Sequence, residues 1–149
     1  MSQLNPNAAF TKAVLGPMVS KSTGTLAATT VPLFTIAGGL VAVTSIVGRV
    51  TTAITVANSY KLQHNPTNGT TADIFAATDI GTTDSALGEI FVATGLKTDT
   101  VIKGARGISH PYIVMETGQI ESVSAGTDGV LLWYVTWVPI DDGATLVAA

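Results

Sequence analysis

The clearest pattern of hydrophobic and polar positions lies near the end of the chain, in the segment GVLLWYVTWVPIDDG. Read as a strand, this segment points its side chains to alternating sides. One side is apolar throughout and the other is nearly so: Leu131, Trp133, Val135 and Trp137 lie on the first, and Leu132, Tyr134, Thr136 and Val138 on the second. A strand that is apolar on both sides is a central one, covered by the core and by an opposing layer or subunit. The pattern predicts Trp133 and Trp137 as core residues, and Tyr134 and Val138 as contacts with a neighbouring subunit.

Segments with strand-forming patterns fill most of the remaining chain. VPLFTIA and LVAVTSIVGRV flank Gly38-Gly39, a pair that is typical of a two-residue hairpin. Further on, Tyr60 and Leu62 share one face of an alternating segment that ends in the turn-forming residues HNPTNGT. No segment has a convincing helical pattern. About seven to nine short strands at this spacing predict an all-β fold, either a β-sandwich or a jelly-roll-like barrel.

The beginning of the chain has a different character. In residues 1–20, prolines and turn-forming residues interrupt scattered apolar side chains such as Phe10, Val14 and Met18. We predict an extended N-terminal arm over 1–20 and a single β-sandwich domain over 21–149. Such an arm is either a frayed terminus or a segment that a partner holds in place, and the pattern allows both.

Composition narrows the possible partners. Hydrophobic residues make up 46% of the 149 residues and charged residues only 11%, which favours a surface that neighbours partly cover. The net charge is −3, and the seven Lys and Arg residues are scattered singly, so we expect no direct binding to nucleic acid. Cysteine is absent, which excludes disulfides and thiolate chemistry and fits synthesis in a reducing cytoplasm.

One uncharged segment, residues 22–48, is long enough to cross a membrane. It contains several threonines, Pro32 and the Gly38-Gly39 pair, and its β-branched residues favour strands. The first residues of the chain also lack the charged-then-apolar pattern of a secretion signal. We therefore predict strands in this segment and no membrane association.

The sequence shows no set of residues suited to catalysis. His64 and His110 both lie beside a proline, in turn contexts, and no metal-binding spacing of histidines occurs. Asp141 and Asp142 precede Gly143 and predict a turn at a strand end, not a pair of catalytic carboxyls. No nucleophile elbow and no phosphate-binding loop with its lysine is found. We expect a protein that is not an enzyme, binds no cofactor or metal, and has a structural or binding role.

Three segments carry a resemblance to a known family: LFTIAGGLVAVTSIVGRVTTAI, HNPTNGTTADI and WYVTWVPIDDGATLVAA. They resemble the head-decoration, or capsid cement, proteins encoded among the structural genes of tailed bacteriophages. The resemblance covers residues 33–149 and leaves the predicted arm outside. It implies a β-rich oligomer on the outside of an icosahedral shell, where it would strengthen contacts between major capsid subunits against the pressure of internal DNA.

The resemblance leads to one main hypothesis and two alternatives. The main one is a capsid decoration protein, made in the host cytoplasm and located on the outer capsid surface of the virion. Its expected partners are the major capsid protein and further copies of itself, in a homodimer or homotrimer, with Phe10, Val14 and Met18 as capsid contacts. The alternatives are a tail or baseplate β-module, and a carbohydrate-binding β-sandwich, which would need exposed aromatic side chains around a groove.

Overall fold

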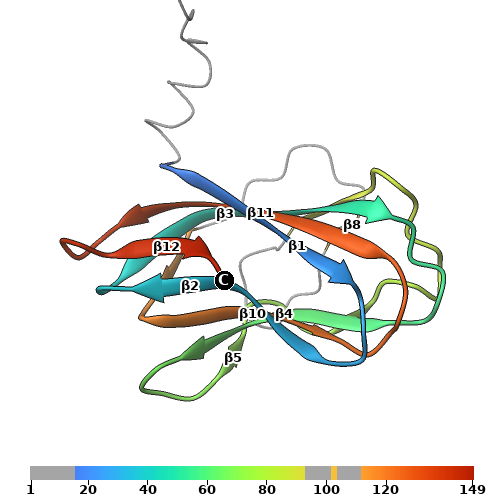
Figure 1. Ribbon diagram of the computed structural model, residues 1–149, viewed down its shortest axis with the longest axis horizontal. Coiled ribbons are helices and arrows are strands. Elements are labelled where there is room, and N and C mark those ends of the chain that lie inside the picture. The colour runs from blue at the N-terminus through green and yellow to red at the C-terminus, as the bar shows by residue number, and fades with distance from the viewer. Residues whose placement is uncertain (1–15, 93–101, 104–111) are drawn as a thin grey trace, which may run out of the picture.

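The fold is an all-β sandwich of two six-stranded antiparallel sheets, as the sequence pattern predicts (Figure 1). The computed structural model describes residues 16–92, 102–103 and 112–149. Its strands are β1 (Met18–Thr25), β2 (Thr30–Ala37), β3 (Val41–Thr52), β4 (Ser59–Pro66), β5 (Ala72–Asp73), β6 (Thr78–Asp79), β7 (Ile90–Val92), β8 (Ile102–Lys103), β9 (Ile113–Met115), β10 (Gly118–Ser124), β11 (Val130–Pro139) and β12 (Thr145–Ala148).

The two sheets are assembled from strands that are far apart in the sequence. Sheet A has the order β1-β11-β3-β7-β8, with β9 also paired to β3. Sheet B has the order β12-β2-β10-β4-β5, with β6 also paired to β4. The apolar segment at the end of the chain forms β11, which lies between β1 and β3 and so has a strand on each side. The two sheets cover each other's inner faces and enclose the core.

The predicted hairpin at Gly38-Gly39 is wrong. The two flanking strands do not pair: β2 belongs to sheet B and β3 to sheet A, so the turn crosses from one sheet to the other. Both glycines have positive φ, and a Cβ on Gly38 would lie 2.5 Å from the carbonyl oxygen of Gly143. Asp141 supports the crossing, because its Oδ2 accepts a hydrogen bond from the Leu40 N–H at 2.7 Å. The glycine pair specified a turn, but the partners of each strand were decided by long-range pairing.

The predicted arm ends earlier than residue 20. Strand β1 begins at Met18 and pairs with β11, so residues 18–20 belong to sheet A. The uncharged segment at 22–48 lies in β1, β2 and β3 and their connections. Within the part of the chain that the structure describes, no helix has the length and apolar character needed to cross a membrane. His64 lies inside β4 and not in the turn that follows it.

An aromatic cluster forms the centre of the core. Trp133 and Tyr60 stack with their planes 4° apart and their centroids separated by 6.1 Å, and Phe75 lies against both rings. The Trp133 Nε1–H donates to the Tyr60 hydroxyl at 2.8 Å, which also bonds to Ser122 Oγ at 2.9 Å. Burial raises the pKa of the Tyr60 hydroxyl above its ordinary value. Its proton is therefore retained, and the buried polar atoms of this cluster satisfy one another.

Trp137 lies at one end of the same core. It is 9% exposed, whereas Trp133 is fully buried, and both belong to the apolar cluster between the sheets. The Nε1–H of Trp137 is buried, and no residue in the described part of the chain accepts a hydrogen bond from it. On β4, Tyr60 and Leu62 are both fully buried, which confirms that they share the inner face.

Two aspartates hold the connection between β3 and β4, which crosses from sheet A to sheet B. Asp128 accepts hydrogen bonds from the N–H and hydroxyl of Thr55, both at 2.8 Å. Asp79 accepts from the Asn58 N–H at 3.0 Å, and also from the Gly81 N–H and the Thr82 hydroxyl. These hydrogen bonds lower the pKa of both carboxyls, with the Thr82 hydroxyl as the largest contribution at Asp79 and the Thr55 N–H at Asp128.

Candidate functional site

Three of the residues predicted to contact partners lie on one surface, the outer face of sheet A. Met18 on β1 is paired with Thr136 on β11, so it points to the same side as Tyr134 and Val138. Their chain neighbours point the other way: Trp133 and Val135 are fully buried. Met18 was expected to contact the capsid, whereas Tyr134 and Val138 were expected to contact another subunit. The structure places all three on the same surface.

Strand register divides this surface into four rows that run across the strands. We call it the sheet A face. The rows are Ser22, Leu132, Arg49 and Ile90; Ser20, Tyr134, Val47 and Val92; Met18, Thr136 and Ser45; and Val138, Ala42 and Val114. Thr44, at a bulge beside the third row, shares a hydrogen bond of 2.8 Å with the Thr136 hydroxyl.

Among the described residues that form the four rows, Arg49 is the only charged one. Met18 is 63% exposed and Val114 50% exposed, Tyr134 and Val138 are half-buried, and Ala42 and Val92 are buried. The polar members, apart from Arg49, are Ser and Thr hydroxyls and the Tyr134 phenol. A surface of this kind is less costly to remove from water than a charged one, because few groups lose strong hydration.

The outer face of sheet B differs in its chemistry. Lys61 and Asp73 form an ion pair at 2.6 Å. Glu121 is only 8% exposed and accepts hydrogen bonds from the side-chain amides of Gln63, at 2.7 Å, and Asn65, at 3.0 Å. These polar groups are already partnered within the molecule.

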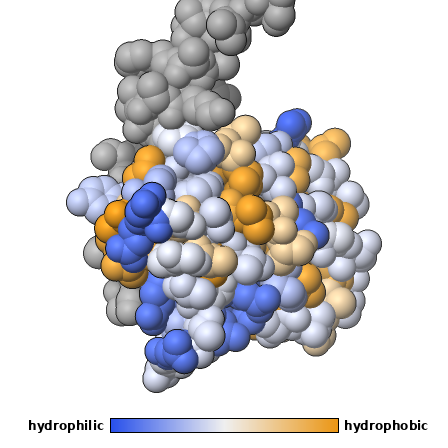
Figure 2. Space-filling model, turned by 60° about the vertical axis from the view of Figure 1, so that its left-hand side comes forward, coloured by the Kyte–Doolittle hydropathy of each residue, from blue (hydrophilic) through white to orange (hydrophobic). Residues whose placement is uncertain are grey.

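Figure 2 shows the molecule with the left-hand side of Figure 1 turned forward, where hydrophobic side chains stand among hydrophilic and neutral ones.

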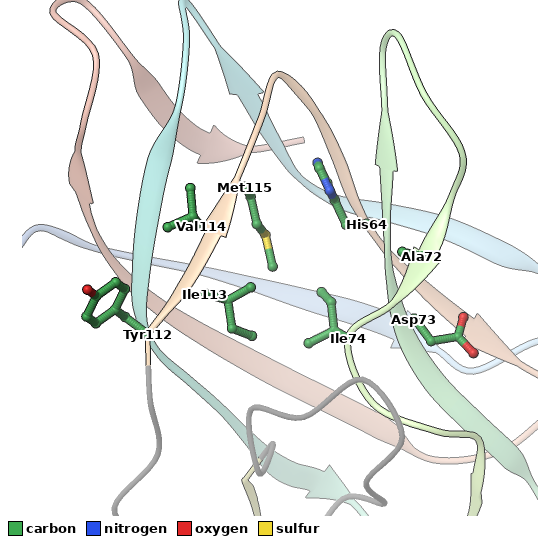
Figure 3. A pocket seen from close by; sticks show the side chains of 8 residues that line it. All are labelled: His64, Ala72, Asp73, Ile74, Tyr112, Ile113, Val114 and Met115. Carbon is green, nitrogen blue, oxygen red and sulfur yellow. The ribbon is translucent and has the colours of Figure 1, made fainter.

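A cleft of about 290 Å³ lies between β5 at the edge of sheet B and β9 at the edge of sheet A (Figure 3). Ile74 and Met115 line it and are almost fully buried. His64 and Asp73 also line it, but each already has a partner: the Glu116 carbonyl oxygen lies 3.0 Å from His64 Nε2, and Asp73 is paired with Lys61. Both side chains are therefore held by contacts within the molecule.

Two other expectations concern a metal site and a carbohydrate-binding surface. Among the described residues, no group of three or more His, Asp or Glu side chains is placed to hold a metal ion. Trp133 and Trp137 are buried, so they do not form the exposed aromatic platform that a carbohydrate-binding sandwich would use. Phe10 and Val14 lie outside the described residues.

The sequence pattern of β11 pointed to Tyr134 and Val138, but it did not identify the rest of the face. Val47 and Arg49 join the face only because β3 pairs with β11, a contact between residues about 85 positions apart. The outward alternation of these residues within LVAVTSIVGRV was the one available signal. Comparison with known proteins gives no match, whether to family models, to curated proteins or to solved structures.

Proposed function

We propose that this protein is a non-enzymatic structural component of a virion, a capsid decoration protein that binds the outer capsid surface and stabilises contacts between major capsid subunits. The observation that carries the proposal is the sheet A face, a broad surface whose described residues include a single charged side chain. The choice of a capsid decoration protein comes from the resemblance of residues 33–149 to that family, which is read from the sequence alone. A protein that works by covering other proteins needs such low-cost surfaces more than it needs reactive groups.

The stabilisation of the shell follows from the coupling of binding to assembly. A protein that binds only the assembled shell lowers the free energy of that state, by an amount that grows with the ratio of its free concentration to its Kd. When one decoration protein spans two capsid subunits, their separation requires the loss of both contacts. The rigid core around Trp133 and Tyr60 suits this role, because a stiff body transmits load between its contacts without unfolding.

The capsid contact that we propose uses the beginning of the chain. Met18 is strongly exposed at the start of β1, and the preceding residues 1–15 include Phe10 and Val14. Specific interfaces bury about 1,200–2,000 Å² in total, which is more than one short segment supplies. A second surface of the sandwich therefore contributes to the attachment.

The test is to locate the protein on virus particles purified from the virus that encodes this sequence. Quantitative mass spectrometry should find it in a copy number similar to that of the major capsid protein, and particle images should place it at symmetry-related positions outside the shell. Removal of residues 1–15 should release the protein from particles. A location in the tail or baseplate, or absence from particles, would contradict the proposal.

A further inference from the structure

We propose that two copies of this protein associate through their sheet A faces, about a twofold axis that runs across the strands. The inference goes beyond the proposed function, because it concerns the free protein, in which no capsid covers the sheet A face. Because Met18 lies on this face, a capsid that binds there takes the place of the second copy. The partner is a second copy because the chemistry of this face is complementary to itself, because its charge selects one orientation, and because its size matches a small specific interface.

The polar groups of the face are self-complementary. Each Ser, Thr and Tyr hydroxyl both donates and accepts a hydrogen bond, so a hydroxyl can pair with the same kind of group on a second copy. A carboxylate only accepts and an ammonium only donates, so a face rich in either could not satisfy itself. The central rows, those of Tyr134 and Thr136, carry hydroxyls and apolar groups without a charge. The outer face of sheet B, with Lys61, Asp73 and Glu121, has the opposite composition.

Arg49 selects the orientation of the pair. A twofold axis parallel to the strands would keep each row opposite itself and bring the two Arg49 side chains close together. An axis across the strands, between the rows of Tyr134 and Thr136, places the row of Arg49 opposite the row of Val138. The two arginines then lie about 20 Å apart along the strands, since residues rise about 3.3 Å each. That distance exceeds the screening length of about 8 Å at physiological salt.

In the same orientation, the Arg49 side chain faces apolar residues of the other copy. It lies opposite the Ala42 position of the other copy, where the buried Ala42 is flanked by the more exposed Val138 and Val114. The aliphatic part of Arg49 can cover these apolar groups while its guanidinium stays in water at the rim. In the centre, Tyr134 lies opposite the row of Thr136, so its hydroxyl meets hydroxyl groups.

The dimensions of the face fit a modest dimer. Four rows extend for about 25 Å along the strands, and four strands side by side extend for about 19 Å. This gives about 500 Å² of flat area, and more once the relief of the side chains is included. Specific interfaces begin at about 600 Å² per partner. We therefore expect a dimer with a Kd in the micromolar range.

The test measures the mass of the full chain in solution by sedimentation equilibrium over a range of concentrations. Wild type should be a dimer. Thr136→Arg places a charge in the central rows of both copies and should raise the Kd at least tenfold. The matched control is Thr35→Arg, a half-buried strand threonine on the outer side of sheet B, which should leave the Kd unchanged. Unchanged thermal unfolding of each variant would show that the fold is retained.

A second set of variants tests the axis. Val138→Glu places a carboxylate beside the partner copy's Arg49 and should keep the dimer, whereas Arg49→Glu combined with Val138→Glu sets like charges against each other and should weaken it at least tenfold. A monomeric or trimeric wild type, or a folded Thr136→Arg variant that still dimerises, would overturn the inference. If the double variant binds as tightly as Val138→Glu alone, the proposed axis is wrong. None of these results depends on finding the protein on particles, so failure of the proposed function is detected separately.

Discussion

The outer faces of the two sheets show how differently one sandwich can treat its two solvent-facing surfaces. On sheet B, the charged groups have partners within the molecule: Glu121 accepts from Gln63 and Asn65, and Lys61 pairs with Asp73. On the sheet A face, a single charge stands among hydroxyl and apolar groups. A surface whose polar groups are already satisfied gains little from a partner, whereas a neutral surface with few charges loses little when water is removed. The comparison therefore identifies sheet A as the surface for association.

The largest expected effect comes from the core that both faces share. Trp133→Ala should lower the free energy of unfolding by about 3–5 kcal/mol, because it removes a fully buried indole and leaves a cavity beside Tyr60 and Phe75. Urea unfolding measures the loss. Trp133→Phe and Trp137→Phe make a matched pair: the first also removes the hydrogen bond to Tyr60, whereas the Trp137 Nε1–H donates to none of the described residues. An equal cost for the two would show that the Tyr60 hydrogen bond contributes nothing to stability.

The next largest effect compares how much a charged residue on each outer face contributes to the free energy of unfolding. Glu121→Ala should lower the free energy of unfolding by about 1–2 kcal/mol, because the amides of Gln63 and Asn65 lose their acceptor. Arg49→Ala, on the sheet A face, should change it by less than about 0.5 kcal/mol. Both values come from chemical denaturation at concentrations at which the protein is monomeric. A larger cost for Arg49→Ala than for Glu121→Ala would reverse the assignment of stabilising and associating faces.

The smallest effect concerns the connection between the sheets and appears only in acid. The pKa values of Asp79 and Asp128 are lowered in the folded protein, so both carboxyls favour folding in their ionised form. Their contribution is complete above the ordinary carboxyl pKa of about 3.9 and is lost as the pH falls toward the lowered values. Thermal unfolding between about pH 5 and pH 2 should show this loss. Asp79→Asn should reduce the pH dependence, whereas Asp142→Asn, in an exposed turn, should leave it unchanged; equal slopes for the two variants would contradict the role of Asp79.

The period of two along a strand was a reliable guide to which side chains share a face. Alternation along β11 separated Trp133 and Trp137 from Tyr134 and Val138, and alternation along β4 placed Tyr60 and Leu62 inside. The Gly38-Gly39 pair correctly marked a turn, but a glycine pair with positive φ serves equally well in a hairpin and in a crossing between sheets. The start of β1 at Met18 was missed because Ser, Lys and Thr give this strand only a weak apolar pattern. The pairing of β1 with β11 is what places it in the sheet.

The sequence by itself determined the all-β class, the buried side of the aromatic strand and the low content of charged residues, because these depend only on residue type and on a period of two. Only the tertiary structure decided which strands share a sheet, and therefore which side chains share a surface. Met18, Val47 and Tyr134 share a surface only because β1, β11 and β3 pair, and backbone hydrogen bonds between strands do not distinguish one sequence from another. The sheet A face exists through those pairings, since they alone bring its rows together.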